Sequence, residues 1–251
     1  MSGEEKHSII RLKPKVSPAK ILAGFPWVYD NELVLDRRTK QLTSGKIVEL
    51  QDSDRKFLAT AVVNPKSKIF ARVITKTANK SGDSELVFKR ISAAKALREG
   101  IFTDPYYRLI NSEADQMPGT IIDRFGDFFV IQPNSVWAEN NLDNITDALV
   151  ELFNPEGIIK NANSRVRTLE GLDDCSLLIH GSIPTTPVKV PMNGAIYMAD
   201  LNHGQKTGLF YDQRQNHAFL SNISKNKTVL DVFSHVGGFA LAALVGGAVE
   251  A

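Results

Sequence analysis

The sequence predicts a multidomain protein of mixed α/β and α+β class, and three observations predict it. Short strand-like runs separated by turn residues fill the first 75 residues. Between about residues 85 and 185, two helical periodicities alternate with strand-like runs. From residue 228, a strand-like run, a glycine-rich turn and a helical run follow one another, which is the first unit of a doubly wound parallel sheet.

The N-terminal part, residues 1–76, is expected to form a small β-barrel-like domain. Ser17 and Pro18 are typical of a helix start and Gly24 of a helix end, so one short helix is expected there. Around this helix, runs rich in Val, Ile or Phe are bounded by Gly, Pro, Asp or Asn, and they predict strands at 9–13, 46–50, 56–64 and 68–75.

The middle part, residues 77–187, is expected to form an α+β domain after a polar linker at 77–84. Two apolar stripes at helical spacing predict two helices. The stripes consist of Val87, Ile91, Ala94, Leu97 and Ile101, and of Leu142, Ile145, Leu149 and Leu152. Strands are predicted at 119–123 and 127–132, as a hairpin, and at 157–160 and 176–180.

The last part, residues 188–251, begins with the strongest hairpin signal in the chain, Asn193-Gly194 between two apolar runs. A helix is predicted to begin near Asp212, a buried strand at 228–233, a helix at 239–244 and a further strand at Val249. One such α/β unit cannot bury both faces of its strand. We therefore expect this part to be the beginning of a domain that continues past Ala251.

Composition excludes several classes of protein. No run approaches the roughly 18 consecutive apolar residues that a membrane span needs, and the N-terminus has no apolar segment typical of a secretory signal. Cys175 is the only cysteine, which excludes an internal disulfide framework and favours the cytoplasm.

The first 75 residues hold 14 Lys and Arg against 8 Asp and Glu. This basic front end fits a polyanion such as RNA, and a solvated Lys-rich surface explains it equally well.

The segment from Val229 to Phe239, VLDVFSHVGGF, is the first candidate for chemistry. Glycines between a parallel strand and its helix let a backbone approach a ligand, and the start of the helix offers free N–H donors. Asp231 can orient this backbone or face a cationic ligand. A tight packing turn explains the pattern as well as a cofactor loop does, and the spacing is not the G-x-G-x-x-G of dinucleotide sites.

The second candidate is the segment from Gly204 to Arg214, GQKTGLFYDQR. Its Lys-Thr pair does not belong to a P-loop, because Gln205 and Asp200 stand where that motif needs glycines. For Asp212 and Arg214 a plain structural role, as a helix-start carboxylate and a surface cation, is the alternative.

Together the two segments resemble the family of PUA-domain-containing 23S ribosomal RNA cytosine-C5 methyltransferases, which are class I S-adenosylmethionine (SAM)-dependent enzymes. The resemblance extends over nearly the whole chain, and the order of its motifs is more specific than any one of them. The further motifs are GFPWVY at 24–29, YRLI at 107–110, MPGTIIDRFG at 117–126 and RTLEGL at 167–172.

The resemblance implies an N-terminal PUA-like β-barrel that contacts RNA, a central α+β domain and the start of a Rossmann-like methyltransferase domain. Pro26 and Trp27 would lie on the RNA-contacting surface, although Trp27 fits a barrel core equally well. S-adenosylmethionine would be the cofactor and ribosomal RNA the partner, with a homodimer left open and no metal. The implied cofactor-binding residues are Lys206, Thr207, Asp212, Arg214, Asp231, Phe233, Ser234, Gly237, Gly238 and Phe239.

Methylation of cytosine at C5 needs a thiolate that adds to C6. Cys175 is a poor candidate, because the neighbouring Asp173 and Asp174 disfavour a thiolate by like-charge repulsion. The resemblance places the nucleophilic cysteine beyond Ala251, so the catalytic residues stay unknown and the chain alone is expected to be inactive. The alternatives are a non-enzymatic RNA-binding protein with a vestigial cofactor loop, and a methyltransferase of the same architecture that acts on another substrate.

Overall fold

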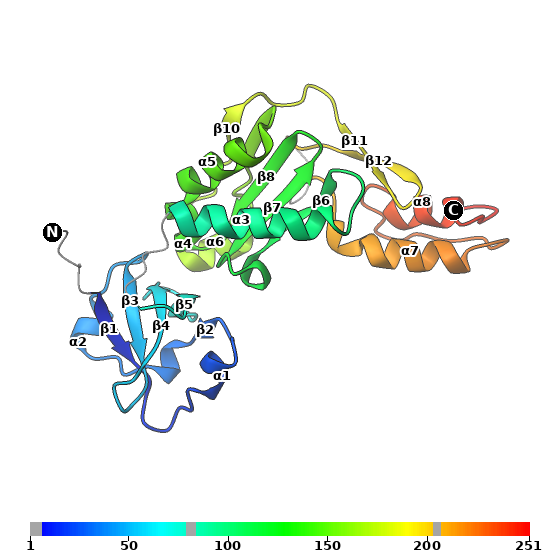
Figure 1. Ribbon diagram of the computed structural model, residues 1–251. Coiled ribbons are helices and arrows are strands. Elements are labelled where there is room, and N and C mark those ends of the chain that lie inside the picture. The colour runs from blue at the N-terminus through cyan, green and yellow to red at the C-terminus, as the bar shows by residue number, and fades with distance from the viewer. Residues whose placement is uncertain (1–6, 79–83, 203–206) are drawn as a thin grey trace.

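A computed structural model describes residues 7–78, 84–202 and 207–251. The chain forms a strand-rich N-terminal part, a central sheet covered by helices, and a C-terminal part built from a hairpin and two helices (Figure 1). No helix of the described residues is long and apolar enough to cross a membrane.

The N-terminal part is a five-stranded sheet in the order β1-β3-β4-β5-β2, with β1 parallel to β3 and the other pairs antiparallel. Alternate side chains of these strands, such as Val48 and Leu50 of β3, point into one apolar core. Its elements are β1 (Ser8–Arg11), α1 (Ala19–Leu22), β2 (Trp27–Val28), η1 (Asp30–Glu32), α2 (Arg37–Lys40), β3 (Ile47–Gln51), β4 (Phe57–Val63) and β5 (Ala71–Thr75). The strands predicted from the sequence are confirmed here.

The central part is a second five-stranded sheet, in the order β10-β9-β8-β7-β6. Only β8 and β9 run parallel. The elements are α3 (Ser84–Glu99), β6 (Tyr106–Asn111), η2 (Ser112–Asp115), β7 (Thr120–Phe125), β8 (Phe128–Pro133), α4 (Val136–Asn140), α5 (Leu142–Phe153), β9 (Gly157–Lys160), α6 (Arg165–Glu170) and β10 (Leu177–Gly181).

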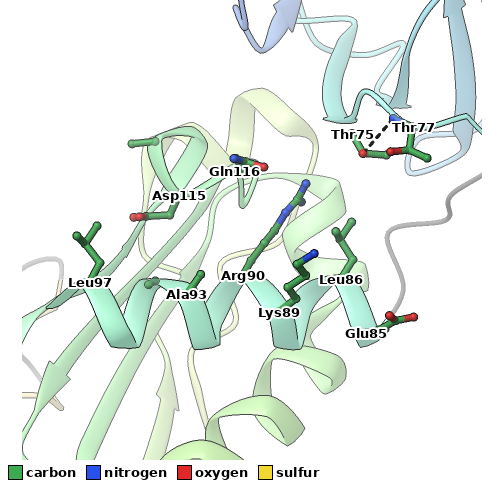
Figure 2. A pocket seen from close by; sticks show the side chains of 12 residues that line it. Thr75, Thr77, Glu85, Leu86, Lys89, Arg90, Ala93, Leu97, Asp115 and Gln116 are labelled. Carbon is green, nitrogen blue, oxygen red and sulfur yellow. Dashed lines mark hydrogen bonds between the residues drawn. The ribbon is translucent and has the colours of Figure 1, made fainter. Parts of the chain in front are cut away.

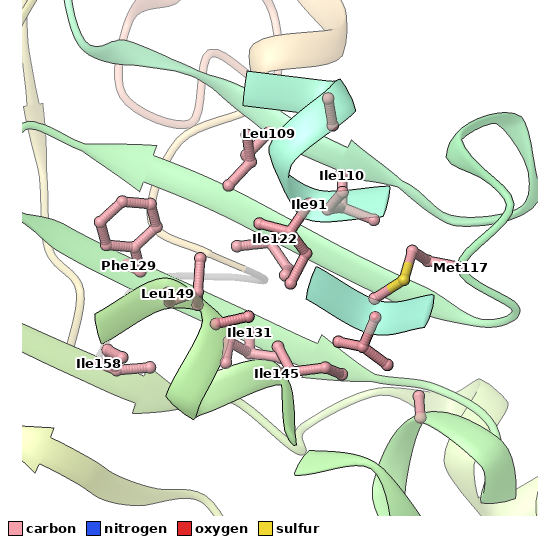
Figure 3. Close-up of a cluster of buried hydrophobic side chains, with 14 of the residues drawn as sticks. Ile91, Leu109, Ile110, Met117, Ile122, Phe129, Ile131, Ile145, Leu149 and Ile158 are labelled. Carbon is pink, nitrogen blue, oxygen red and sulfur yellow. The ribbon is translucent and has the colours of Figure 1, made fainter. Parts of the chain in front are cut away.

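The two faces of the central sheet are buried against different partners. Phe129 and Ile131 of β8 pack with α3 and α5 in the largest apolar cluster (Figure 3). Val130, which points the opposite way, packs with the C-terminal hairpin instead. The central sheet therefore packs against the helices of its own part on one face and against the C-terminal part on the other.

The predicted helix at the start of this part is confirmed, but its apolar stripe is shorter than expected. Val87, Ile91 and Ala94 are buried, whereas Leu97 is 55% and Ile101 62% exposed. The helix ends at Glu99, so Ile101 no longer follows its periodicity. Strand β6 and the short helices α4 and α6 were not expected as elements.

The C-terminal part consists of β11 (Val188–Met192), β12 (Ala195–Ala199), η3 (Tyr211–Gln213), α7 (Arg214–Ile223) and α8 (Gly238–Val245). The hairpin turns at Asn193 and Gly194, which both have left-handed backbones, as predicted.

The predicted buried strand at 228–233 does not form. Only Thr228 bridges in parallel to Glu250. Leu230, Val232 and Phe233 are 87%, 63% and 99% exposed. A parallel strand needs neighbours that take up its backbone groups and cover both its faces, and the described residues supply only the short run near Glu250.

The N-terminal and central parts are joined by buried charged groups. Arg72 of β5 donates to Glu113 (3.0 Å) and to Glu170 (2.9 Å), one on each side of its guanidinium. Asn64 also donates to the Glu170 carboxylate (2.9 Å). Arg72, Glu170 and Asn64 are all buried, which fixes the geometry of this junction.

Candidate functional site

The glycine-rich turn from Asp231 to Phe239 leads directly into α8. Gly237 caps the helix with a left-handed backbone (φ +70°), and its N–H donates to the carbonyl of Ser234 (2.8 Å). A Cβ on Gly237 would meet no atom within 4 Å, so the space beside it is open. The turn therefore presents an exposed stretch of backbone at the start of a helix.

Asp231 holds this turn against the helix. Its carboxylate accepts the N–H of Ala240 at 3.2 Å. The first turn of a helix leaves its N–H groups without intrahelical partners, and a carboxylate is a favourable acceptor there. Of the two roles expected for Asp231, orienting the backbone is thus observed.

Gly238 is required by a close contact with α7. A Cβ at this position would lie 2.8 Å from the ring of His217. That ring is buried between Tyr197, stacked at 5.7 Å, and Phe239, edge-on at 4.6 Å. Gly238 is therefore a packing residue that lets α8 approach α7, whereas Gly237 faces open space.

Burial lowers the pKa of His217, and the nearby charge of Asp231 acts in the opposite direction. Its Nδ1 atom is buried and has no hydrogen-bond partner among the described residues. The imidazole is consequently held neutral in an aromatic environment.

The two segments singled out in the sequence lie side by side. Phe210 stacks on His235 with ring centroids 4.6 Å apart. His217, which follows the segment 204–214 on α7, contacts Gly238 and Phe239 of the segment 229–239. Phe210, His217 and His235 were not among the predicted site residues, because a sequence offers no local signal for contacts between segments.

Thr207 is bound to the central sheet. Its Oγ1 lies 2.6 Å from Asp123 Oδ2, and the Asp123 carboxylate also accepts two hydrogen bonds from Arg108, at 2.9 and 3.1 Å. Thr207 and Asp123 are buried. Burial opposes the charge of Arg108, but the hydrogen bond and attraction of Asp123 outweigh it and raise the pKa of Arg108. Thr207 thus anchors its loop to β7.

Asp212 and Arg214 line one cavity of about 250 Å³ between β6 and η3. Arg214 lies over the ring of Phe102 at 4.4 Å, and Arg108 also lines the cavity. Burial lowers the pKa of Arg214, and its Nη1 atom has no hydrogen-bond partner among the described residues. This cavity combines cationic and aromatic groups with the carboxylate of Asp212, a lining suited to a planar ligand that carries charges of both signs.

The ten predicted residues therefore fall into separate groups. Asp231, Phe233, Ser234, Gly237, Gly238 and Phe239 belong to one turn, whereas Asp212 and Arg214 line the cavity and Thr207 contacts Asp123. Lys206 lies outside the described residues.

Trp27 is neither a barrel-core residue nor a free surface aromatic. Its indole N–H donates to Glu113 of the central part at 2.9 Å, and Arg72 lies 5.8 Å from its ring. Trp27 is half-buried and belongs to the junction between the two parts. Within the ranges that the structure describes, no cluster of three or more acidic, His or Cys side chains could hold a metal ion.

The chain thus combines an N-terminal PUA-like domain with a mixed α/β fold that it shares with solved structures. A family model described as a PUA-like domain matches residues 10–76. A Streptococcus mutans protein assigned as a SAM-dependent methyltransferase superposes with a TM-score of 0.81 and 24% identity, over 96% of this chain and 61% of that one. A second such structure, of a protein complexed with SAH, superposes with a TM-score of 0.80 and 24% identity, over 97% of this chain and 61% of that one.

The similar curated proteins are named ribosomal RNA large subunit methyltransferase I. That of Vibrio vulnificus is 38% identical over 231 residues, covering 91% of this chain and 57% of the relative. That of Aliivibrio fischeri is 35% identical over 226 residues, covering 89% and 57%. The chain is thus a relative of these proteins, and it spans somewhat under three fifths of their length.

Proposed function

We propose that this chain is part of a SAM-dependent methyltransferase that forms 5-methylcytosine in 23S ribosomal RNA. The observation that carries the proposal is the open backbone at Gly237, held by Asp231 and lying next to the segment that contains Phe210. The names of the similar proteins and the PUA-like domain support the same activity.

The chemistry of the turn fits the cofactor. S-adenosylmethionine supplies a methyl group on a positively charged sulfonium and carries a carboxylate at its methionine end. Exposed backbone at a helix start suits an anionic group, and an acidic side chain suits a cation. The fully exposed Phe233 and the exposed Ser234 offer an apolar face and a hydroxyl beside it.

Different residues take different roles in this proposal. Gly237, Ser234 and Phe233 would contact the cofactor, while Asp231, Gly238 and Phe239 shape the turn that receives it. Thr207 would be held in place through Asp123, and Lys206, which precedes it in the sequence, would contact the cofactor. Asp212 and Arg214 would close the site from the cavity that they share with Arg108.

The division of the chain follows from the same proposal. We assign residues 1–76 to a PUA-like RNA-binding domain, 77–187 to a central α+β domain, and 188–251 to the N-terminal part of the methyltransferase domain. The RNA partner would be ribosomal and the site of action cytoplasmic.

Cys175 would not be the nucleophile of this reaction. It is exposed in the loop before β10, where its backbone N–H donates to Asp173 Oδ1 at 3.3 Å. The loop belongs to the central part of the chain and not to the glycine-rich turn. In the whole protein, Cys175→Ser is therefore expected to leave methyl transfer unchanged.

The proposal is tested by transfer of labelled methyl from S-adenosylmethionine to 23S ribosomal RNA transcribed in vitro, using the whole protein. Mapping of the modified nucleotide should locate the label on C5 of a cytosine. A folded whole protein that labels no RNA would exclude the enzymatic function, and label on another base would exclude the cytosine assignment.

A further inference from the structure

A cavity of about 510 Å³ lies at the junction of the N-terminal and central parts, away from the site described above (Figure 2). It opens between the end of β5, the exposed length of α3 and the end of η2. Its polar lining comes from Thr75, Thr77, Glu85, Lys89, Arg90, Asp115 and Gln116. Lys89, Thr77 and Leu97 at its rim are exposed, so the cavity is continuous with the surface.

Arg90 is the unusual group in this cavity. Its side chain rises from α3 toward the gap between the two parts (Figure 2) and is only 8% exposed. One nitrogen, Nη2, donates to the carbonyl of Ile74 in β5. The Nε and Nη1 atoms are buried and have no hydrogen-bond partner among the described residues. Two unmet donors on a buried cation are costly, which indicates a ligand that supplies acceptors.

The neighbouring carboxylates do not neutralise Arg90. Asp115 lines the cavity, but its Oδ2 accepts from Arg98 at 2.7 Å and from the N–H of Asn111 at 2.6 Å. Glu85 is exposed in the first turn of α3. Burial lowers the pKa of Arg90 to about 10, so its charge persists at neutral pH. The cavity therefore holds a cation without a partner anion.

We infer that this cleft binds a phosphate group of the RNA backbone, with Arg90 as its buried ligand and Lys89 at the rim. A phosphate has only acceptor oxygens and a negative charge, and a guanidinium can donate to two of them at once. The hydroxyls of Thr75 and Thr77 and the amide of Gln116 add neutral donors. The choice of RNA as the source of the phosphate rests on the proposed function.

Two measurements separate the sources of phosphate. In the first, inorganic phosphate is titrated into the chain while the NMR signal of the Arg90 Nε–H group is followed. In the second, binding of 23S ribosomal RNA transcribed in vitro is measured at several salt concentrations. The variants are Arg90→Gln, Arg90→Lys and Arg165→Gln, where Arg165 is exposed at the start of α6 in the central part and serves as the control of equal charge.

We expect phosphate and RNA to shift the Arg90 signal. Arg90→Gln should weaken RNA binding about tenfold, by loss of one charge-assisted contact. The slope of log K against log salt should fall by about one, whereas Arg165→Gln should change neither quantity. Arg90→Lys keeps the charge and should retain most of the slope. The signal of the unaltered chain stays informative even if Arg90→Gln loosens the junction.

Any other outcome contradicts one specific claim: the RNA assignment, the phosphate site or the proposed function. A signal that moves with phosphate, together with equal RNA binding by the Gln variants of Arg90 and Arg165, would make this a site for a free anion and defeat the RNA assignment. A signal that moves with neither probe would mean that water satisfies Arg90, and the inference would fail. A whole, unaltered protein that binds no ribosomal RNA would defeat the proposed function itself.

Discussion

Arg72 is the residue on which the junction between the first two parts depends most. Its guanidinium lies between two carboxylates, those of Glu113 and Glu170, and Glu113 also accepts the indole N–H of Trp27. Burial alone would raise the pKa of Glu113, but the hydrogen bonds from Ser112 and Trp27 and the charge of Arg72 together outweigh it and lower the pKa. A buried pair of this kind is weak evidence for net stability, but breaking it is costly.

Replacement of Arg72 by methionine should therefore lower the free energy of unfolding by about 3 kcal/mol, because the buried Glu170 and the partly buried Glu113 lose the cation between them. Urea denaturation of the chain measures this change. Arg37→Met, at an exposed position of α2, serves as the control and should change the free energy by less than about 0.5 kcal/mol. Equal effects of the two variants would show that the ion pairs of Arg72 contribute nothing to the free energy of unfolding.

Gly238 gives a second prediction at the scale of a single residue. Gly238→Ala places a methyl group 2.8 Å from the His217 ring and should destabilise the packing of α8 on α7 by about 1–3 kcal/mol. Hydrogen exchange of the α7 and α8 amides would report the loss. Gly100→Ala, whose added Cβ would come no closer than 3.5 Å to its neighbours, is the matched control. A Gly238 variant with unchanged exchange would contradict the close approach.

The buried His217 predicts a dependence of stability on pH. Since burial lowers its pKa in the folded state below the ordinary value of 6.5, the unfolded chain takes up its proton first as the pH falls. The contribution of the neutral His217 to the free energy of unfolding is therefore fully present above about pH 6.5. It is lost as the pH falls below 6.5 toward the lower pKa of the folded state. Unfolding free energies measured between pH 8 and pH 5 should fall more steeply for the unaltered chain than for His217→Gln. Parallel curves of unfolding free energy against pH for the two proteins would refute a stabilising role of the neutral His217.

At the scale of elements, the sequence predicts what local patterns determine. The hairpin at Asn193-Gly194 and the helix that carries Leu142, Ile145 and Leu149 are confirmed, because turn chemistry and helical periodicity act within a few residues. The strand predicted at 228–233 is wrong in the structure of this chain. Its apolar run is typical of a buried strand, but a strand depends on partners that a local pattern does not contain.

The hairpin also anchors α7, which gives a prediction for an element. Asn193 has a left-handed backbone (φ +53°), and its side-chain amide donates to the carbonyl of Arg214 at 2.7 Å. Asn193→Ala removes this bond and places a residue that disfavours such a backbone there, so we expect a loss of about 1–2 kcal/mol. Faster exchange of the β11 and β12 amides would be the readout. The control is Ile196→Thr, at an exposed position of β12. Unchanged exchange in the Asn193 variant would contradict the anchoring role.

At the scale of the whole molecule, much of the candidate site could not be predicted from the sequence. The glycine-rich turn was found because its glycines and Asp231 stand together in the chain. The contacts of Thr207 with Asp123 and of Trp27 with Glu113 join residues 84 and 86 positions apart, and only the packing of whole elements creates them. The same holds for the stacking of Phe210 on His235.

The central claim, that the turn between Asp231 and Phe239 receives S-adenosylmethionine, is tested most directly by calorimetric titration of this cofactor into the whole protein. We predict saturable binding that is lost in Gly237→Val, because a branched side chain would fill the open space and strain the left-handed backbone. Gly100→Ala should bind as the unaltered protein does. A folded, unaltered protein that takes up no cofactor, or a Gly237→Val variant that binds it undiminished, would contradict the account.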